Sequence, residues 1–214
     1  MALLAKVGYG QVEINKLEAQ KTGAINAQLP VDPAVFDTLA GLGLPRAIQN
    51  GMFMDYDYGA TDVSGVANYN GAGACKLPGK VGGSDLTGLV YNEIILFVDW
   101  HTCKDFALTE QDATNYIQAN GVAKKTVFPR LYTPAAGDVI TTNLVADTNG
   151  VVKDAPAVQI STFKVGDLFT PNTDGVLKKI SADADEKIVY RCVKVYTMAD
   201  LQPALKLACI KAYS

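Results

Sequence analysis

Residues 163–196 read FKVGDLFTPNTDGVLKKISADADEKIVYRCVKVY, and this stretch decides the predicted fold. It opens with an apolar strand pattern, turns at Asp174-Gly175, and ends in an alternating strand over residues 188–196. An Asp-Gly pair between apolar runs is a strong hairpin signal, because such turns need residues with positive φ. A polar segment at residues 181–186 separates the last two strands. The stretch therefore predicts consecutive antiparallel strands.

The same phrasing occurs once earlier in the chain. Residues 137–143 read GDVITTN, which resembles GDLFTPN at residues 166–172. Likewise TNGVVK at residues 148–153 resembles TDGVLK at residues 173–178. Two copies are too few for a solenoid. We therefore predict two similar hairpins, over residues 137–153 and 166–195, in one β-rich domain.

Composition limits the class of protein. The chain has 214 residues, 49% hydrophobic and 19% charged, which is typical of an ordered globular protein. Its net charge of -3 argues against binding to nucleic acid, which usually requires a basic patch. No apolar run reaches the roughly 18 residues of a membrane-spanning helix, and no signal peptide is evident. The four dispersed cysteines form no CxxC pair, so we expect reduced thiols and an intracellular origin.

Residues 1–46 are predicted to form an extended arm followed by a short helix. The arm sustains neither the helical nor the strand period, so we expect it to lie across a neighbour. Asp32 is the expected N-cap of the helix, Pro33 its first residue and Gly41 its end. Its apolar stripe is expected to consist of Val35, Phe36 and Leu39.

Residues 47–214 are predicted to form a mainly β domain of antiparallel hairpins, arranged as a sandwich or barrel. Residues 52–58 alternate as a strand does, with Met52, Met54 and Tyr56 on one face. The glycine-rich residues 63–88 are expected to form a long surface loop. Further expectations are a buried strand at residues 94–98, a second short helix at residues 109–119 and a closing strand at residues 204–213.

Four features were weighed as sites of chemistry, and none fits. His101, the only histidine, lies near Cys103, but no third group is evident to orient the pair. The glycine-rich residues 71–81 have the wrong spacing for a phosphate-binding loop. Asp55 and Asp57 share a strand face, which suits paired carboxylate chemistry, a calcium site or a solvated surface. Residues 183–186 lack the spacing of a calcium loop. We therefore expect no catalytic residue, no cofactor and no metal.

Several phrases resemble virion proteins of tailed bacteriophages. They are NGMFMDYDY at residues 50–58, YNE at residues 91–93, KDFAL at residues 104–108 and QPALKL at residues 202–207. The chain is most similar to capsid auxiliary proteins, also called decoration or head-fibre-base proteins. The phrases VGDL at residues 165–168 and DGVL at residues 174–177 are similar to hairpins of such proteins. The likeness covers residues 47–210.

This resemblance implies a non-enzymatic protein that binds the outer surface of the major capsid shell and stabilises contacts between capsomers. The implied partners are the major capsid protein and neighbouring copies or other virion proteins, with no nucleic acid and no membrane. It would be made in the host bacterial cytoplasm and reside on the virion. The arm would supply apolar anchors to the partner, for which the candidates are Ile14, Leu17 and Ile25. The alternatives are a head fibre, tail or baseplate subunit and, more remotely, a small carboxylate-dependent hydrolase.

Overall fold

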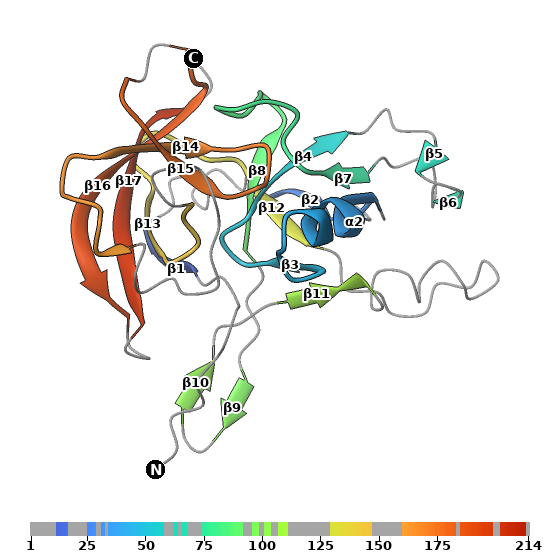
Figure 1. Ribbon diagram of the computed structural model, residues 1–214, viewed down its shortest axis with the longest axis horizontal. Coiled ribbons are helices and arrows are strands. Elements are labelled where there is room, and N and C mark those ends of the chain that lie inside the picture. The colour runs from blue at the N-terminus through green and yellow to red at the C-terminus, as the bar shows by residue number, and fades with distance from the viewer. Residues whose placement is uncertain are drawn as a thin grey trace.

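The structure is a computed structural model, and it describes part of the chain. The described residues are 12–16, 25–28, 31–32, 34–57, 62–63, 66–67, 74–91, 96–98, 101–103, 107–110, 129–146, 160–182, 185–198 and 202–212. Over these residues the chain is mainly β and its ladders are antiparallel, as predicted. Two sheets pack against each other and a helix covers the second sheet (Figure 1).

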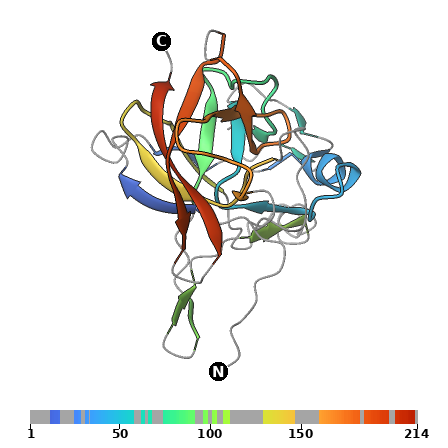
Figure 2. The same ribbon diagram turned by 60° about the vertical axis from the view of Figure 1, so that its left-hand side comes forward.

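The first sheet has six strands and contains the stretch that decides the fold. Its order is β1 (Val12–Lys16), β13 (Val139–Thr142), β17 (Pro203–Ala212), β16 (Ile188–Thr197), β14 (Leu168–Pro171) and β15 (Leu177–Ile180). The two longest strands, β16 and β17, are neighbours at its centre and form a twisted ribbon (Figure 2). The predicted strands at residues 188–196 and 204–213 are therefore confirmed.

The second sheet has five strands. Its order is β2 (Ile25–Gln28), β12 (Arg130–Tyr132), β8 (Thr87–Val90), β4 (Phe53–Asp57) and β7 (Ala74–Lys76). The remaining strands form three pairs: β3 (Ala47–Gln49) with β11 (Ala107–Thr109), β9 (Leu96–Val98) with β10 (His101–Cys103), and β5 (Asp62–Val63) with β6 (Val66–Ala67).

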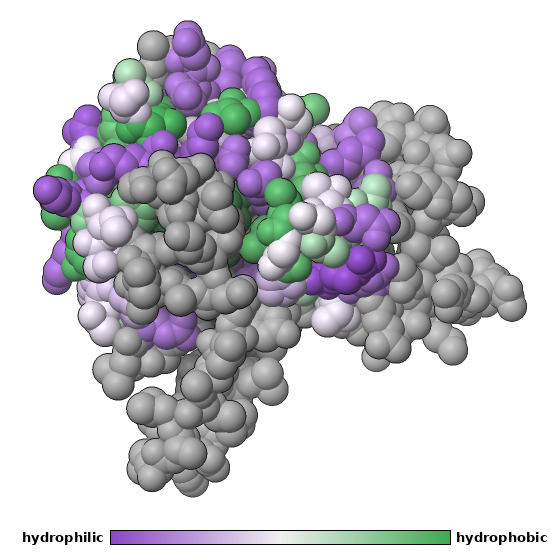
Figure 3. All heavy atoms as spheres, viewed as in Figure 1, coloured by the Kyte–Doolittle hydropathy of each residue, from purple (hydrophilic) through white to green (hydrophobic). Residues whose placement is uncertain are grey.

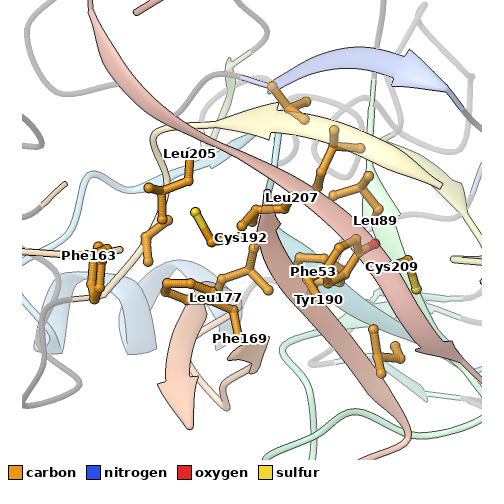
Figure 4. Close-up of a cluster of buried hydrophobic side chains, with 14 of the residues drawn as sticks. Phe53, Leu89, Phe163, Phe169, Leu177, Tyr190, Cys192, Leu205, Leu207 and Cys209 are labelled. Carbon is orange, nitrogen blue, oxygen red and sulfur yellow. The ribbon is translucent and has the colours of Figure 1, made fainter. Parts of the chain in front are cut away.

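The alternation predicted for residues 52–58 divides β4 between two cores. Phe53 packs into the core between the two sheets, where its ring meets Tyr190 edge-on at 6.0 Å (Figure 4). Met54 and Tyr56 point to the opposite face and pack into the second core, beneath the helix. Because successive side chains of a strand alternate between faces, one strand supplies both cores.

The helix α2 (Ala34–Gly41) closes the second core and begins as predicted. Asp32 caps it, since its Oδ1 accepts a hydrogen bond from the Ala34 N–H at 3.0 Å. The predicted stripe is buried; its members are Val35, Phe36 and Leu39. The helix packs against the five-stranded sheet. The predicted N-terminal segment, residues 1–46, and the predicted β domain, residues 47–214, therefore share one core.

The turn at Asp174-Gly175 forms as predicted and also joins the two sheets. Gly175 has a φ of 77°, and its N–H donates to the Asn172 carbonyl at 3.0 Å. The Phe53 N–H donates to the Gly175 carbonyl at 2.7 Å. The hairpin of the first sheet is thereby anchored on β4 of the second.

Two segments differ from the sequence expectations. The glycine-rich residues 63–88 are not loop throughout, because residues 74–76 form β7 beside β4 and bury Cys75 completely. In the N-terminal segment, β1 and β2 each add an edge strand to a main sheet, and Val12 is buried in the core. The described part of the expected arm therefore belongs to the body. Of the second predicted helix, Thr109 instead ends strand β11, and residues 111–119 lie outside the described residues. Of the predicted strand at residues 94–98, residues 96–98 form β9 and residues 94–95 are not described.

Candidate interaction surface

The repeated Gly-Asp phrase forms the same turn twice. In the first copy, the Ala135 N–H donates to Asp138 Oδ2 at 2.8 Å, and the Asp138 N–H donates to the Ala135 carbonyl at 3.0 Å. Gly137, with a φ of 97°, donates its N–H to the Cys209 carbonyl at 2.9 Å. The Cys209 N–H returns a bond to the Asp138 carbonyl at 2.8 Å. The turn thus fastens the start of β13 to β17.

The second copy reproduces each of these bonds on β16. The Lys164 N–H donates to Asp167 Oδ2 at 2.9 Å, and the Asp167 N–H donates to the Lys164 carbonyl at 3.1 Å. Gly166, with a φ of 95°, donates to the Cys192 carbonyl at 2.8 Å. The Cys192 N–H donates to the Asp167 carbonyl at 2.8 Å. The similarity of GDVITT and GDLFTP in the sequence is therefore a structural equivalence, whereas residues 147–153 of the second similar phrase are not described.

An approximate twofold axis runs through the middle of the six-stranded sheet. The strand order on one side of the axis, β17-β13-β1, mirrors the order on the other side, β16-β14-β15. The axis falls on the central rung of the β16–β17 ladder, whose successive pairs are Tyr190↔Cys209, Arg191↔Ala208 and Cys192↔Leu207.

Each central strand also carries a bulge at the equivalent place. Val193 is the extra residue of β16 and Ile210 that of β17, because the register shifts across each of them. The sequences at the bulges are Cys192-Val193-Lys194 and Cys209-Ile210-Lys211. This second repeat was missed in the sequence, although a comparison of residues 188–197 with residues 205–214 would have found it.

Beyond its bulge, β16 leaves the core. Cys192 is completely buried, whereas the residues that follow are exposed except for the half-buried Tyr196. Val193 and Val195 are each 43% exposed. Val165 is 66% exposed and precedes Gly166, whose N–H binds the Cys192 carbonyl. The strand therefore presents apolar side chains to solvent at the end of the ribbon.

Two lysines face one tyrosine on this part of the ribbon. Lys194 and Lys206 are directly opposite each other in the ladder. Their Nζ atoms lie 5.6 Å and 5.5 Å from the centroid of the Tyr196 ring. Like charges at opposite positions destabilise a strand pair, and the π face of the ring offsets part of that repulsion. We refer to Lys194, Tyr196 and Lys206 as the lysine–tyrosine cluster.

The ribbon is basic although the protein is acidic. Strands β16 and β17 carry no acidic residue, while the whole chain has 22 acidic and 19 basic residues. The basic residues of the two strands are Arg191, Lys194, Lys206 and Lys211. Figure 3 shows the face of the molecule that is seen in Figure 1. Hydrophilic residues cover most of its described surface, with separate hydrophobic areas between them.

Of the candidate carboxylates, Asp55 has a structural role. Asp55 Oδ2 accepts the Gly79 N–H at 2.9 Å, and Asp55 Oδ1 accepts a bond from the Thr87 hydroxyl. Asp55 therefore holds the connection between β7 and β8. Asp57 is half-buried on the same strand. Among the described residues, no group of three or more His, Cys, Asp or Glu is placed to hold a metal ion.

The other predicted positions are only partly described. Residues 71–73 and the side chains of His101 and Cys103 lie outside the described residues. Of the proposed anchors, Leu17 lies outside the described residues, and Ile14 and Ile25 are described by their backbones. Ile14 pairs with Ile140 in the first sheet and Ile25 with Tyr132 in the second. Deleting residues 1–30 would therefore remove two strands as well as any contact with a partner.

Comparison with protein-family models, curated proteins and solved structures found no match to this chain. No helix among the residues that the structure describes is long and apolar enough to span a membrane.

Proposed function

We propose that this protein is a capsid auxiliary protein of a tailed bacteriophage, which binds the outer surface of the major capsid shell and stabilises contacts between capsomers. The sequence phrases that resemble such proteins suggest this class. One structural observation supports it most: the last part of β16, after Cys192, is exposed and presents both apolar and basic side chains, while its partner strand β17 stays packed on the core. Such a mixture of apolar contact area and charge is typical of surfaces that bind other proteins.

The body behind the ribbon suits a subunit that must hold its shape on a particle. Besides the Gly175 contact, residues 77–86 connect the two sheets. The Gly82 N–H donates to the Pro171 carbonyl at 2.9 Å, and the Gly82 carbonyl accepts the Ile188 N–H at 3.0 Å. A ribbon fixed to both sheets loses little conformational freedom on binding, which favours affinity.

In this proposal the protein has no catalytic activity, and its partners are the major capsid protein and neighbouring copies of itself. The anchoring role of Asp55 supports a structural function over a carboxylate-dependent hydrolase. After synthesis in the host cytoplasm, the protein would be incorporated into the virion. Its binding sites on the particle would lie on the outer shell and not on the tail.

A sedimentation experiment tests the proposal. Particles assembled without this protein are mixed with the purified protein and pelleted. We expect the protein to pellet with the particles and to saturate at a fixed ratio to the major capsid protein. Tails purified free of heads are the control. Binding to tails alone would instead assign the protein to the tail, and failure to pellet with either would contradict a role in the virion.

A further inference from the structure

We propose that the lysine–tyrosine cluster forms the docking surface, and that the surface it binds is an acidic patch on a partner protein. The inference rests on the proposed function for the identity of the partner. It rests on the structure for the location of the surface.

The first argument is an electrostatic repulsion between two lysines that the Tyr196 ring offsets only in part. Lys194 and Lys206 occupy directly opposite positions and share one ring. The ion pairs of the described residues connect neither lysine to a carboxylate. An arrangement that violates a local pairing rule is expected at functional sites. Carboxylates from a partner would remove the repulsion.

The second argument is the charge balance of the ribbon. A net charge of -3 on the whole chain opposes approach to an acidic partner, but all the charged residues of β16 and β17 are basic. Complementary potentials steer two proteins into one orientation and exclude others. The basic ribbon would therefore determine which face of the protein meets the partner.

The third argument concerns the class of partner. Val165, Val193 and Val195 expose aliphatic side chains near the cluster, with Val195 on the face of β16 opposite Lys194 and Tyr196. A partner that contacts this exposed segment from both sides would meet apolar area, as is usual in a protein interface. Nucleic acid would be bound by several aromatic stacking platforms along a basic groove, whereas the cluster contains one ring. The aliphatic neighbours thus favour an acidic protein surface.

The test compares two variants of the full chain with equal charge. Lys194→Gln/Lys206→Gln removes the two charges of the cluster. Lys76→Gln/Lys80→Gln removes two charges from exposed lysines on and after β7, in the other sheet. Circular dichroism and denaturant unfolding verify that both variants fold. The probes are particles lacking this protein, immobilised poly-L-glutamate, and a single-stranded oligonucleotide.

We expect the cluster variant to bind both particles and poly-L-glutamate about tenfold more weakly than wild type, as the loss of two interfacial charges implies. The control variant should bind within about twofold of wild type, and salt should weaken wild-type binding most. Particle binding that is equal in the two variants would overturn the docking surface while leaving the proposed function intact. Cluster-dependent binding to poly-L-glutamate, with no binding to particles, would support the surface and contradict the proposed function.

Two further outcomes would overturn the choice of partner. Cluster-dependent binding to the oligonucleotide that exceeds binding to poly-L-glutamate would assign the surface to nucleic acid. Self-association in light scattering that disappears in the cluster variant would assign it to a second copy of the chain.

Discussion

Cys192 and Cys209 occupy equivalent positions on the two central strands of the six-stranded sheet. Each carbonyl accepts the N–H of a Gly-Asp turn glycine, at 2.8 Å for Cys192 and 2.9 Å for Cys209, and each N–H donates to the aspartate carbonyl of that turn. Figure 4 shows the two sulfur atoms apart, toward different ends of the core. The equivalence indicates that the sheet is built from two similar halves.

The two aspartates of these turns should both matter for stability. Replacing Asp138 or Asp167 with alanine removes the acceptor for a backbone N–H, and we expect a loss of about 1–3 kcal/mol in the free energy of unfolding. Asp85 is the control, because its side chain is 72% exposed, and Asp85→Ala should cost less than about 0.5 kcal/mol. Denaturant titration measures the free energy of unfolding of all three variants, and a loss for either turn aspartate as small as that for Asp85→Ala would contradict the prediction.

Glycines at the sheet junctions should tolerate alanine in a defined order. A Cβ on Gly82 would lie 2.9 Å from Glu186 Cα, and φ there is 87°, so Gly82→Ala should cost about 2 kcal/mol or more. Gly166 has a positive φ but open space, so alanine there should cost about 1 kcal/mol. Gly41→Ala, in open space at the end of the helix, should be neutral or slightly stabilising. Thermal unfolding of the three variants measures their stabilities, and any other order would contradict this prediction.

The Asp167 carboxylate should make the protein more sensitive to acid. Burial alone would raise its pKa, but hydrogen bonds from Lys179 and the Lys164 backbone outweigh burial and lower the pKa from its usual value. Its stabilisation is therefore complete above the unfolded-state pKa and is lost as pH falls through the lower folded-state value. The free energies of unfolding of wild type and Asp167→Asn should be measured from about pH 6 to about pH 2, and the difference between them should shrink as the pH falls. A difference that stays constant in acid would count against this.

The two central cysteines should resist thiol reagents. Burial raises the pKa of the Cys192 thiol, and burial with the nearby Asp138 charge raises that of Cys209 to about 12. The reactive thiolate is thus scarce at neutral pH in the folded protein. Peptide mapping after iodoacetamide should find both residues unmodified until denaturant is added. Ser181→Cys, at an exposed position, is the control that should react at once.

The features predicted correctly from the sequence are those that depend on residues close together in the chain. Turn chemistry at Asp174-Gly175 and alternation in residues 188–196 depend on neighbouring residues, so the hairpin over residues 166–195 and the Asp32 cap were predictable. Of the other predicted hairpin, residues 147–153 lie outside the described residues. Strand β7 was missed because the glycine content of residues 71–79 hides a strand that forms only against β4. The opposition of Lys194 and Lys206 depends on the bulge at Val193, which shifts the register after Cys192. Long-range pairing of this kind has no short-range signature.

The proposed anchors illustrate the same difference. An irregular pattern in residues 11–29 suggested an arm without internal partners, but β1 and β2 find partners in β13 and β12, far along the chain. The basic ribbon was likewise hidden by a composition that is acidic overall. Its lysines come from two strands and become a cluster only when those strands pair.

The central claim is that this protein occupies the outside of a bacteriophage capsid, and cryo-electron microscopy of the assembled particle tests it most directly. The account predicts extra density on the outer shell, absent from particles that lack the protein. The two-sheet body should fit this density with the end of β16 and the start of β17 toward the capsid. Density confined to the tail or baseplate, or no difference between the two particles, would contradict it.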